Sequence, residues 1–151
     1  MTTRRAFTAA FAAALCLAAP LRAQDTFTET LEIAGGFARA SPMVASAGAG
    51  FMTIRSLGPA DRLTGFRSPA CDRPELHTHV NDDGMMRMRE VEAIEIPAGS
   101  EAVLEPGGLH LMFIDLAAPL VEGEMVEVTL LFEQAGELTL SLPVKGPGAM
   151  Q

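Results

Sequence analysis

Cysteine is scarce in this 151-residue sequence, which contains only Cys16 and Cys71. Cys16 lies in an N-terminal segment that we expect to be removed, so the mature chain keeps one thiol and cannot form an intramolecular disulfide. An enzyme using Cys71 as a nucleophile beside His77 or His79 would need an orienting partner. The sequence offers no Cys-x-x-Cys pair, no nucleophile elbow and no obvious orienting carboxylate. We therefore predict that the protein is not an enzyme.

Basic residues are also few, with 11 Lys and Arg against 19 Asp and Glu. Without residues 1–23 the basic residues fall to eight, for a net charge near −11. This balance argues against nucleic acid and anionic membrane surfaces as partners. Beyond the N-terminus no segment is long and apolar enough to cross a bilayer, so we expect no membrane insertion of the mature protein.

Residues 1–23 have the features of a secretion signal. Arg4 and Arg5 form a basic start, residues 6–19 form an apolar segment too short to span a bilayer, and Ala23 is a small residue at the cleavage point. Residues 3–7 also resemble a twin-arginine signal, so the Sec and twin-arginine routes both stay open. Leucine rather than a small residue precedes Cys16, which argues against a lipid anchor. We predict a periplasmic protein.

The remaining residues, 24–151, show short runs of alternating apolar and polar residues and no convincing amphipathic helix. Turn signals separate these runs every 8–12 residues or so, a spacing typical of an antiparallel β-sandwich. We expect Gly35-Gly36 to turn the chain after a first strand and Gly136 to join the last two. The prediction is one all-β domain over residues 24–151, with Met52, Met85 and Met125 as core residues. The strand candidates are residues 26–33, 37–40, 51–54, 62–66, 109–116, 125–133 and 137–144.

One stretch, residues 75–116, contains all three histidines and four of the nine methionines of the chain. Imidazole and thioether are soft, neutral ligands, which suit copper(I) better than zinc, calcium or magnesium. A lone histidine is more often an exposed polar residue, and a lone methionine more often fills space in the core. The repeated pairing of the two residue types is what favours a metal site.

A hairpin with residues 81–84 as its loop would bring the first ligands together. In that register His79 lies opposite Met86 and His77 lies opposite Met88, all four on one face. His110 and Met112 share a face of a later strand, while Leu111 and Phe113 point into the core. Facing each other, the two pieces would form an N2S2 copper(I) site of His77, Met88, His110 and Met112.

The spacing His77-x10-Met88-x21-His110-x-Met112 resembles the motif of the periplasmic copper(I) chaperone family, often called PCuAC and formerly DUF461. Similar phrases cover essentially the whole mature chain. They are AGAGFMTI at 47–54, DRL at 61–63, ELH at 75–77, MRMR at 86–89, IPAG at 96–99 and EPGGLHLM at 105–112.

The resemblance implies a cupredoxin-like Greek-key β-sandwich that holds one Cu(I) near its surface through His77, Met88, His110 and Met112. It also implies delivery of copper to the CuA centre of cytochrome c oxidase, through subunit II directly or through a Sco-type partner. We expect a monomer. Family members commonly carry methionine where this chain has His79, so His79 and Met86 are auxiliary candidates. The tail also lacks the His- and Met-rich extension of some members.

Two other functions remain open from the residues themselves. A cupredoxin-like electron carrier would need two histidines, a cysteine and a weak axial methionine, and Cys71 precedes His77 instead of lying beside His110. An exported β-sandwich that binds partners without metal would retain no copper.

Overall fold

The computed structural model describes residues 25–151, so the predicted signal at 1–23 lies outside the described residues. The described chain is built from β-strands and turns, and within it no helix is long and apolar enough to cross a bilayer. The strands are β1 (Thr26–Phe27), β2 (Leu31–Arg39), β3 (Ala47–Ser56), β4 (Asp61–Arg67), β5 (Cys71–Asp82), β6 (Met85–Glu90), β7 (Ile94–Ile96), β8 (Glu101–Leu104), β9 (His110–Leu116), β10 (Met125–Phe132) and β11 (Gly136–Lys145).

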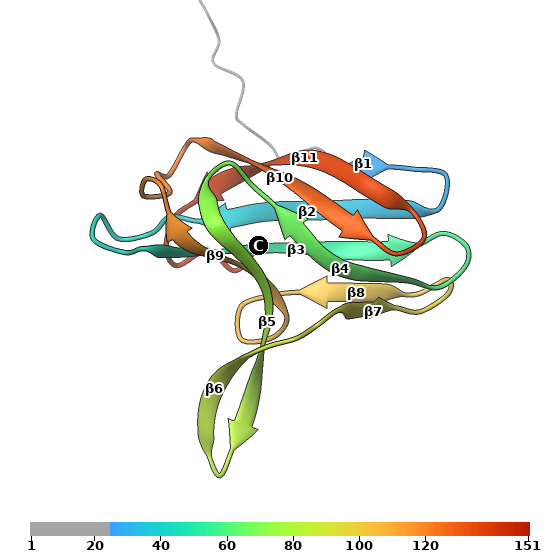
Figure 1. Ribbon diagram of the computed structural model, residues 1–151, viewed down its shortest axis with the longest axis horizontal. Coiled ribbons are helices and arrows are strands. Elements are labelled where there is room, and N and C mark those ends of the chain that lie inside the picture. The colour runs from blue at the N-terminus through green and yellow to red at the C-terminus, as the bar shows by residue number, and fades with distance from the viewer. Residues whose placement is uncertain (1–24) are drawn as a thin grey trace, which may run out of the picture.

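The strands pair into two layers that share one junction (Figure 1). The first layer has the order β6-β5-β9-β3-β2, with β1 on β2 and β8 on β3. The second has the order β11-β10-β4-β7. The β2–β11 junction pairs Ala38 with Val144 and is parallel, whereas the other strand pairings are antiparallel. The predicted all-β antiparallel sandwich is confirmed, and the short β2–β11 junction adds one parallel pairing to it.

Alternating apolar residues of both layers fill the space between them. Leu111 and Phe113 of β9 are fully buried, as the alternation predicts, and Phe113 meets Phe66 of β4 edge-on with ring centroids 5.1 Å apart. Met52 is buried as expected, but Met85 and Met125 are exposed, so their assignment to the core is wrong. Met85 lies on β6, whose residues are all exposed, and Met125 is the exposed first residue of β10.

Gly35-Gly36 does not end a strand, contrary to prediction. Strand β2 continues through both glycines, and its register against β3 shifts between Ala34 and Phe37, which is a β-bulge. Gly35 has a φ of 63°, a conformation that glycine adopts without steric cost. At Gly36 a Cβ would lie 2.7 Å from Cδ2 of Leu142, so a larger residue there would have to displace this buried side chain of β11.

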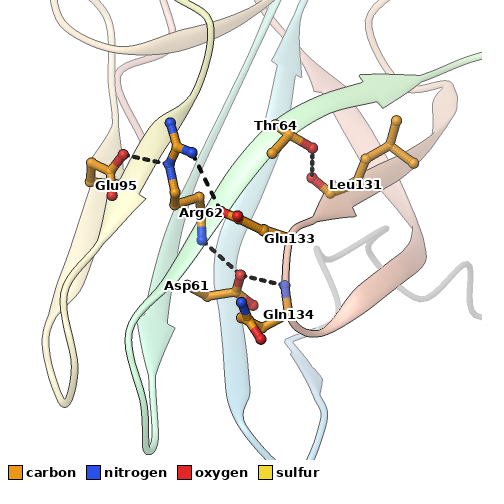
Figure 2. A network of polar contacts seen from close by, with 7 residues as sticks. All are labelled: Asp61, Arg62, Thr64, Glu95, Leu131, Glu133 and Gln134. Carbon is orange, nitrogen blue, oxygen red and sulfur yellow. Dashed lines mark hydrogen bonds and ion pairs between the residues drawn. The ribbon is translucent and has the colours of Figure 1, made fainter.

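A buried carboxylate anchors the β10–β11 turn (Figure 2). Asp61 accepts hydrogen bonds from the backbone N–H groups of Arg62, Gln134 and Ala135 at 2.7, 2.9 and 2.9 Å. Above it, Arg62 forms exposed ion pairs with Glu95 and Glu133. Buried polar groups need such partners, so Asp61 ties the second layer together at the end remote from the histidines.

Candidate metal centre

The candidate ligands lie around the β5–β6 hairpin, which projects from the body of the sandwich (Figure 1). Its turn is only two residues long, because Asp82 already pairs with Met85. Asp83 and Gly84 have φ values of 50° and 84°, and positive φ at both positions is the type I′ conformation that matches strand twist. The Gly84 N–H donates to Oδ1 of Asn81 at 2.8 Å, which closes the turn.

Because the turn has two residues and not the predicted four, the observed register of the hairpin differs from the predicted register by two residues. His79 lies opposite Met88, not Met86, and His77 lies opposite Glu90, not Met88. Met86 lies opposite Asn81 instead. A shift of two residues leaves each side chain on its face, so His77, His79, Met86 and Met88 still share one side of the hairpin.

His77 occupies the junction between two strand pairings. The first half of β5 pairs with β9 up to His77–His110, and the second half pairs with β6 from His77–Glu90 onward. Met112 lies opposite Glu75 on the same β5–β9 ladder. The imidazoles of His77 and His79 have ring centroids 5.9 and 5.2 Å from that of His110. The fold therefore gathers all three histidines and Met112 beside the hairpin that carries Met88.

A pocket of about 290 Å³ opens at this place. His79, Met88, His110 and Met112 line it, whereas His77, whose side chain is largely buried, does not. Met88 is half exposed and Met86 is exposed further along β6. In residues 25–151, no three His, Cys, Asp or Glu side chains are grouped closely enough to hold a metal by themselves. Any soft-metal site here has to include the thioethers.

His110 is the buried member of the set, with 3% of its surface exposed. Its Nδ1 lies 3.0 Å from the carbonyl oxygen of Gly108, so Nδ1 carries the proton and Nε2 keeps a free lone pair. Burial lowers the pKa of this imidazole, the neighbouring His79 and His77 lower it further, and the Gly108 bond opposes the shift. His110 is therefore held in the neutral form that a metal requires.

His77 has one satisfied and one unsatisfied ring nitrogen. Its Nε2 lies 2.8 Å from Oε2 of Glu75, and its Nδ1 is buried without a hydrogen-bond partner among the described residues. His79 is less constrained, with Nδ1 3.4 Å from the same Gly108 oxygen that His110 uses. Orphaned buried polar atoms are rare in folded proteins, so the Nδ1 atom of His77 is positioned for a partner that is not a protein group.

Sequence reasoning missed three contributors to this site: Glu75, Arg39 and Phe51. The i, i+2 spacing of Glu75 and His77 on one strand was the available signal for the first. The Arg39 guanidinium lies 5.3 Å from the centroid of the Phe51 ring, and both residues line the pocket. Arg39 also donates to the carbonyl of Ala149 at 2.7 Å, which holds the C-terminal tail against the pocket wall. No pattern in the sequence signalled these contacts.

Cys71 lies away from the three histidines. It pairs with Leu116 at the opposite end of the β5–β9 ladder, six residues before His77, or about 20 Å along a strand. Its thiol is buried, and that burial raises its pKa. The arrangement of two histidines, a cysteine and a methionine that a blue-copper site needs is therefore not formed among the described residues.

Comparison with known proteins places the chain in a family. The family model described as "Putative lipoprotein LpqE-like" matches residues 31–144, well over half of the chain. The chain belongs to the LpqE-like family. A relative from Leifsonia xyli subsp. xyli, described as "Putative lipoprotein Lxx21020", is 35% identical over 99 residues. That alignment covers 64% of this chain and 60% of the relative, so the chain spans well under two thirds of the relative's length.

Solved structures similar to this LpqE-like chain include PCuAC domains. The apo PCuAC domain of PmoF2 superposes with a TM-score of 0.70 at 26% identity, covering 85% of this chain and 99% of that one. Its copper-bound form gives 0.71 at 25% identity, with coverage of 82% and 99%. The solution structure of CuI-DR1885 from Deinococcus radiodurans gives 0.61 at 28% identity, with coverage of 78% and 80%. The cupredoxin-like sandwich expected from the sequence resemblance is the fold of this chain.

Proposed function

We propose that this protein is an exported copper(I) chaperone that binds one Cu(I) through His77, Met88, His110 and Met112. The observation that carries the proposal is that His77, which has a buried ring nitrogen without a hydrogen-bond partner among the described residues, lies directly opposite His110, whose neutral imidazole keeps a free lone pair. Two thioethers lie in the adjoining pocket. Two imidazoles and two thioethers form a neutral, soft donor set that copper(I) accepts readily. Copper is present in two of the similar structures, the PmoF2 domain and CuI-DR1885.

His79 and Met86 extend this proposed set toward solvent. His79 lies opposite Met88 and lines the pocket, so it can supply a third imidazole as copper arrives or leaves. Met86 lies two residues further toward the turn and is exposed, too far along β6 for a place in the inner set. We propose that both residues contact copper while it enters or leaves, and that neither is a ligand in the stable Cu(I) complex.

Transfer by ligand exchange follows from the unequal burial of the ligands. His110 is buried and held by Gly108, whereas Met88 lies half exposed on an outer strand of the sheet. An acceptor can approach from the hairpin side and replace Met88 first, while His110 keeps the copper until the new bonds form. We propose that the acceptor is the CuA site of cytochrome c oxidase, reached through subunit II or a Sco-type protein.

The proposal also covers export and domain organisation. Residues 1–23 act as a signal, by the Sec or twin-arginine route, and residues 24–151 form one monomeric periplasmic domain. The lipoprotein descriptions of the family and of the Leifsonia relative support an exported class of protein. Mass spectrometry of the processed protein tests this: a lipid on Cys16 would contradict the free mature N-terminus near residue 24 that we expect.

An anaerobic Cu(I) titration against a chromophoric Cu(I) competitor tests the central claim. The mature protein should bind one tight equivalent, and the double variant His110→Ala/Met112→Ala should lose it. Met125→Ala, which removes an exposed thioether outside the pocket, is the matched control and should bind like the wild type. No competition by the wild type would leave the rival reading of an exported binding module without metal.

A further inference from the structure

We propose that Glu75 is a positioning residue of the copper site, which fixes the His77 ring so that Nδ1, and not Nε2, is offered to copper. The inference rests on the proposed copper(I) function and specifies which atom of the site binds. It comes from the contact between Glu75 and His77 and from the nitrogen that this contact leaves free.

The hydrogen bond between the two side chains determines the tautomer. Glu75 and His77 are two residues apart on β5 and therefore project from the same face. Oε2 of Glu75 lies 2.8 Å from Nε2 of His77, and an ionised carboxylate can only accept, so the proton is on Nε2. In a neutral imidazole the other nitrogen is then the one with the free lone pair, which here is Nδ1.

The lone pair on Nδ1 is buried and has no protein partner among the described residues. A buried acceptor without a hydrogen bond loses its hydration without a compensating interaction. Folded proteins rarely contain such groups. Copper(I) supplies the missing partner. The burial and the tautomer together therefore point to Nδ1 as the donor atom.

The carboxylate of Glu75 also lies near a basic side chain. Its other oxygen, Oε1, lies 3.5 Å from Nε of Arg73, the next residue on the same face of β5. Glu75 is only 19% exposed, and Met112 lies opposite it on β9. A fixed carboxylate behind a ligating imidazole raises the basicity of the ligand and restrains its rotation. It also places one negative charge beside the bound Cu⁺ without adding a hard ligand.

The two facing histidines are thus oriented by different acceptors and present different nitrogens. Gly108 accepts from Nδ1 of His110 and leaves Nε2 free, whereas Glu75 accepts from Nε2 of His77 and leaves Nδ1 free. The ring centroids are 5.9 Å apart, so nitrogens on the facing sides of the two rings can share one ion. The opposite tautomers are the signature that an experiment can detect.

Long-range proton–nitrogen NMR of the histidine rings tests the assignment in the whole mature protein. The apo spectrum, recorded well above the ordinary imidazole pKa of about 6.5, should show the Nε2–H tautomer for His77 and the Nδ1–H tautomer for His110. Anaerobic Cu(I) should then shift Nδ1 of His77 and Nε2 of His110. A copper-induced shift at Nε2 of His77 would overturn the inference.

Substitutions of Glu75 separate positioning from a general structural effect. Glu75→Ala should abolish the His77 tautomer preference and weaken Cu(I) binding about 10–100-fold. Glu75→Gln keeps an oxygen that accepts from Nε2, so it should retain the tautomer and restore most of the affinity. Glu101→Ala, which removes a carboxylate paired with Arg55 outside the pocket, should change neither.

The outcomes distinguish this inference from the proposed function. If the wild type binds no Cu(I), the chaperone proposal fails, and the apo tautomer of His77 still tests the role of Glu75. If the wild type binds Cu(I) but Glu75→Ala leaves the tautomer and the affinity unchanged, the chaperone proposal stands and the positioning role is wrong.

Discussion

His77 and His110 lie directly opposite each other on β5 and β9, with ring centroids 5.9 Å apart. They differ in environment: the second is buried in the sheet, and the first lies where β5 passes from β9 to the projecting hairpin. One side of the candidate centre is therefore formed by the sandwich, and the other side by a hairpin that joins the sandwich only at its base.

Removing His110 should affect Cu(I) binding more than removing His79. His110→Ala deletes the anchored imidazole and should weaken binding more than about 100-fold, beyond the usual effect of an outer-shell residue. His79→Ala leaves four donors in place, so we expect a loss below about tenfold. Competition titrations of the two variants give the comparison, and an equal loss would mean that His79 is a ligand in the stable Cu(I) complex.

The type I′ turn should control the position of Met88. Gly84 has a φ of 84°, so Gly84→Ala imposes strain of about 1–3 kcal/mol on the turn. The residues of β6 are all exposed, so the register should loosen and Cu(I) affinity should fall while the global unfolding midpoint changes little. Gly58→Ala is the control, because its Cβ meets nothing within 4 Å and its φ lies outside the left-handed region. Backbone hydrogen exchange of β6 reports the loosening directly.

Replacing Asp61 should lower the free energy of unfolding and leave the Cu(I) affinity unchanged. Asp61→Ala removes the carboxylate that accepts from the N–H groups of Arg62, Gln134 and Ala135, and a hydrogen bond to a charged group contributes about 1.5–3 kcal/mol. Urea unfolding measures the loss. Glu133→Gln removes only an exposed ion pair and should change stability by less than about 1 kcal/mol. A large loss of Cu(I) affinity in Asp61→Ala at a temperature where it is folded would contradict this separation.

The Cys71 thiol should make the mature protein less stable at alkaline pH. Burial raises its pKa in the folded state, so the unfolded chain loses the proton first. The stabilising contribution is complete below the unfolded thiol pKa of about 8.5 and is lost as pH rises through the folded value. Denaturant unfolding as a function of pH measures the slope, and Cys71→Ala should flatten it. Rapid alkylation of the native protein near neutral pH would show that the thiol is not protected.

Much of the fold could be predicted because strand alternation depends on local burial. The alternation in β9 placed Leu111 and Phe113 in the core, and β10 and β11 were recognised from the same two-residue period. The failures have physical causes. Gly35-Gly36 has the composition of a turn, but pairing of β2 with β3 on both sides makes it a bulge. Met85 has an apolar side chain, but it lies on β6, whose residues are all exposed.

The candidate site, like the fold, was predictable only in part. Spacing along the chain was enough to select the histidines and methionines, because alternation fixes which side chains share a face. Their partners across the sheet depend on the turn, and a two-residue turn in place of a four-residue loop moved Met88 from His77 to His79.

The sequence by itself determined the soft donor set of the candidate centre, since residues 75–116 contain all three histidines and four of the nine methionines, and the only cysteine of the described residues lies outside them. It also determined the strand faces, because the two-residue period is a property of the extended backbone. Only the tertiary structure decided that His77 lies opposite His110 and that Glu75 accepts a hydrogen bond from Nε2 of His77. Register and ring orientation depend on groups from separate strands, and no local pattern in the chain encodes which of them will be close enough to bond.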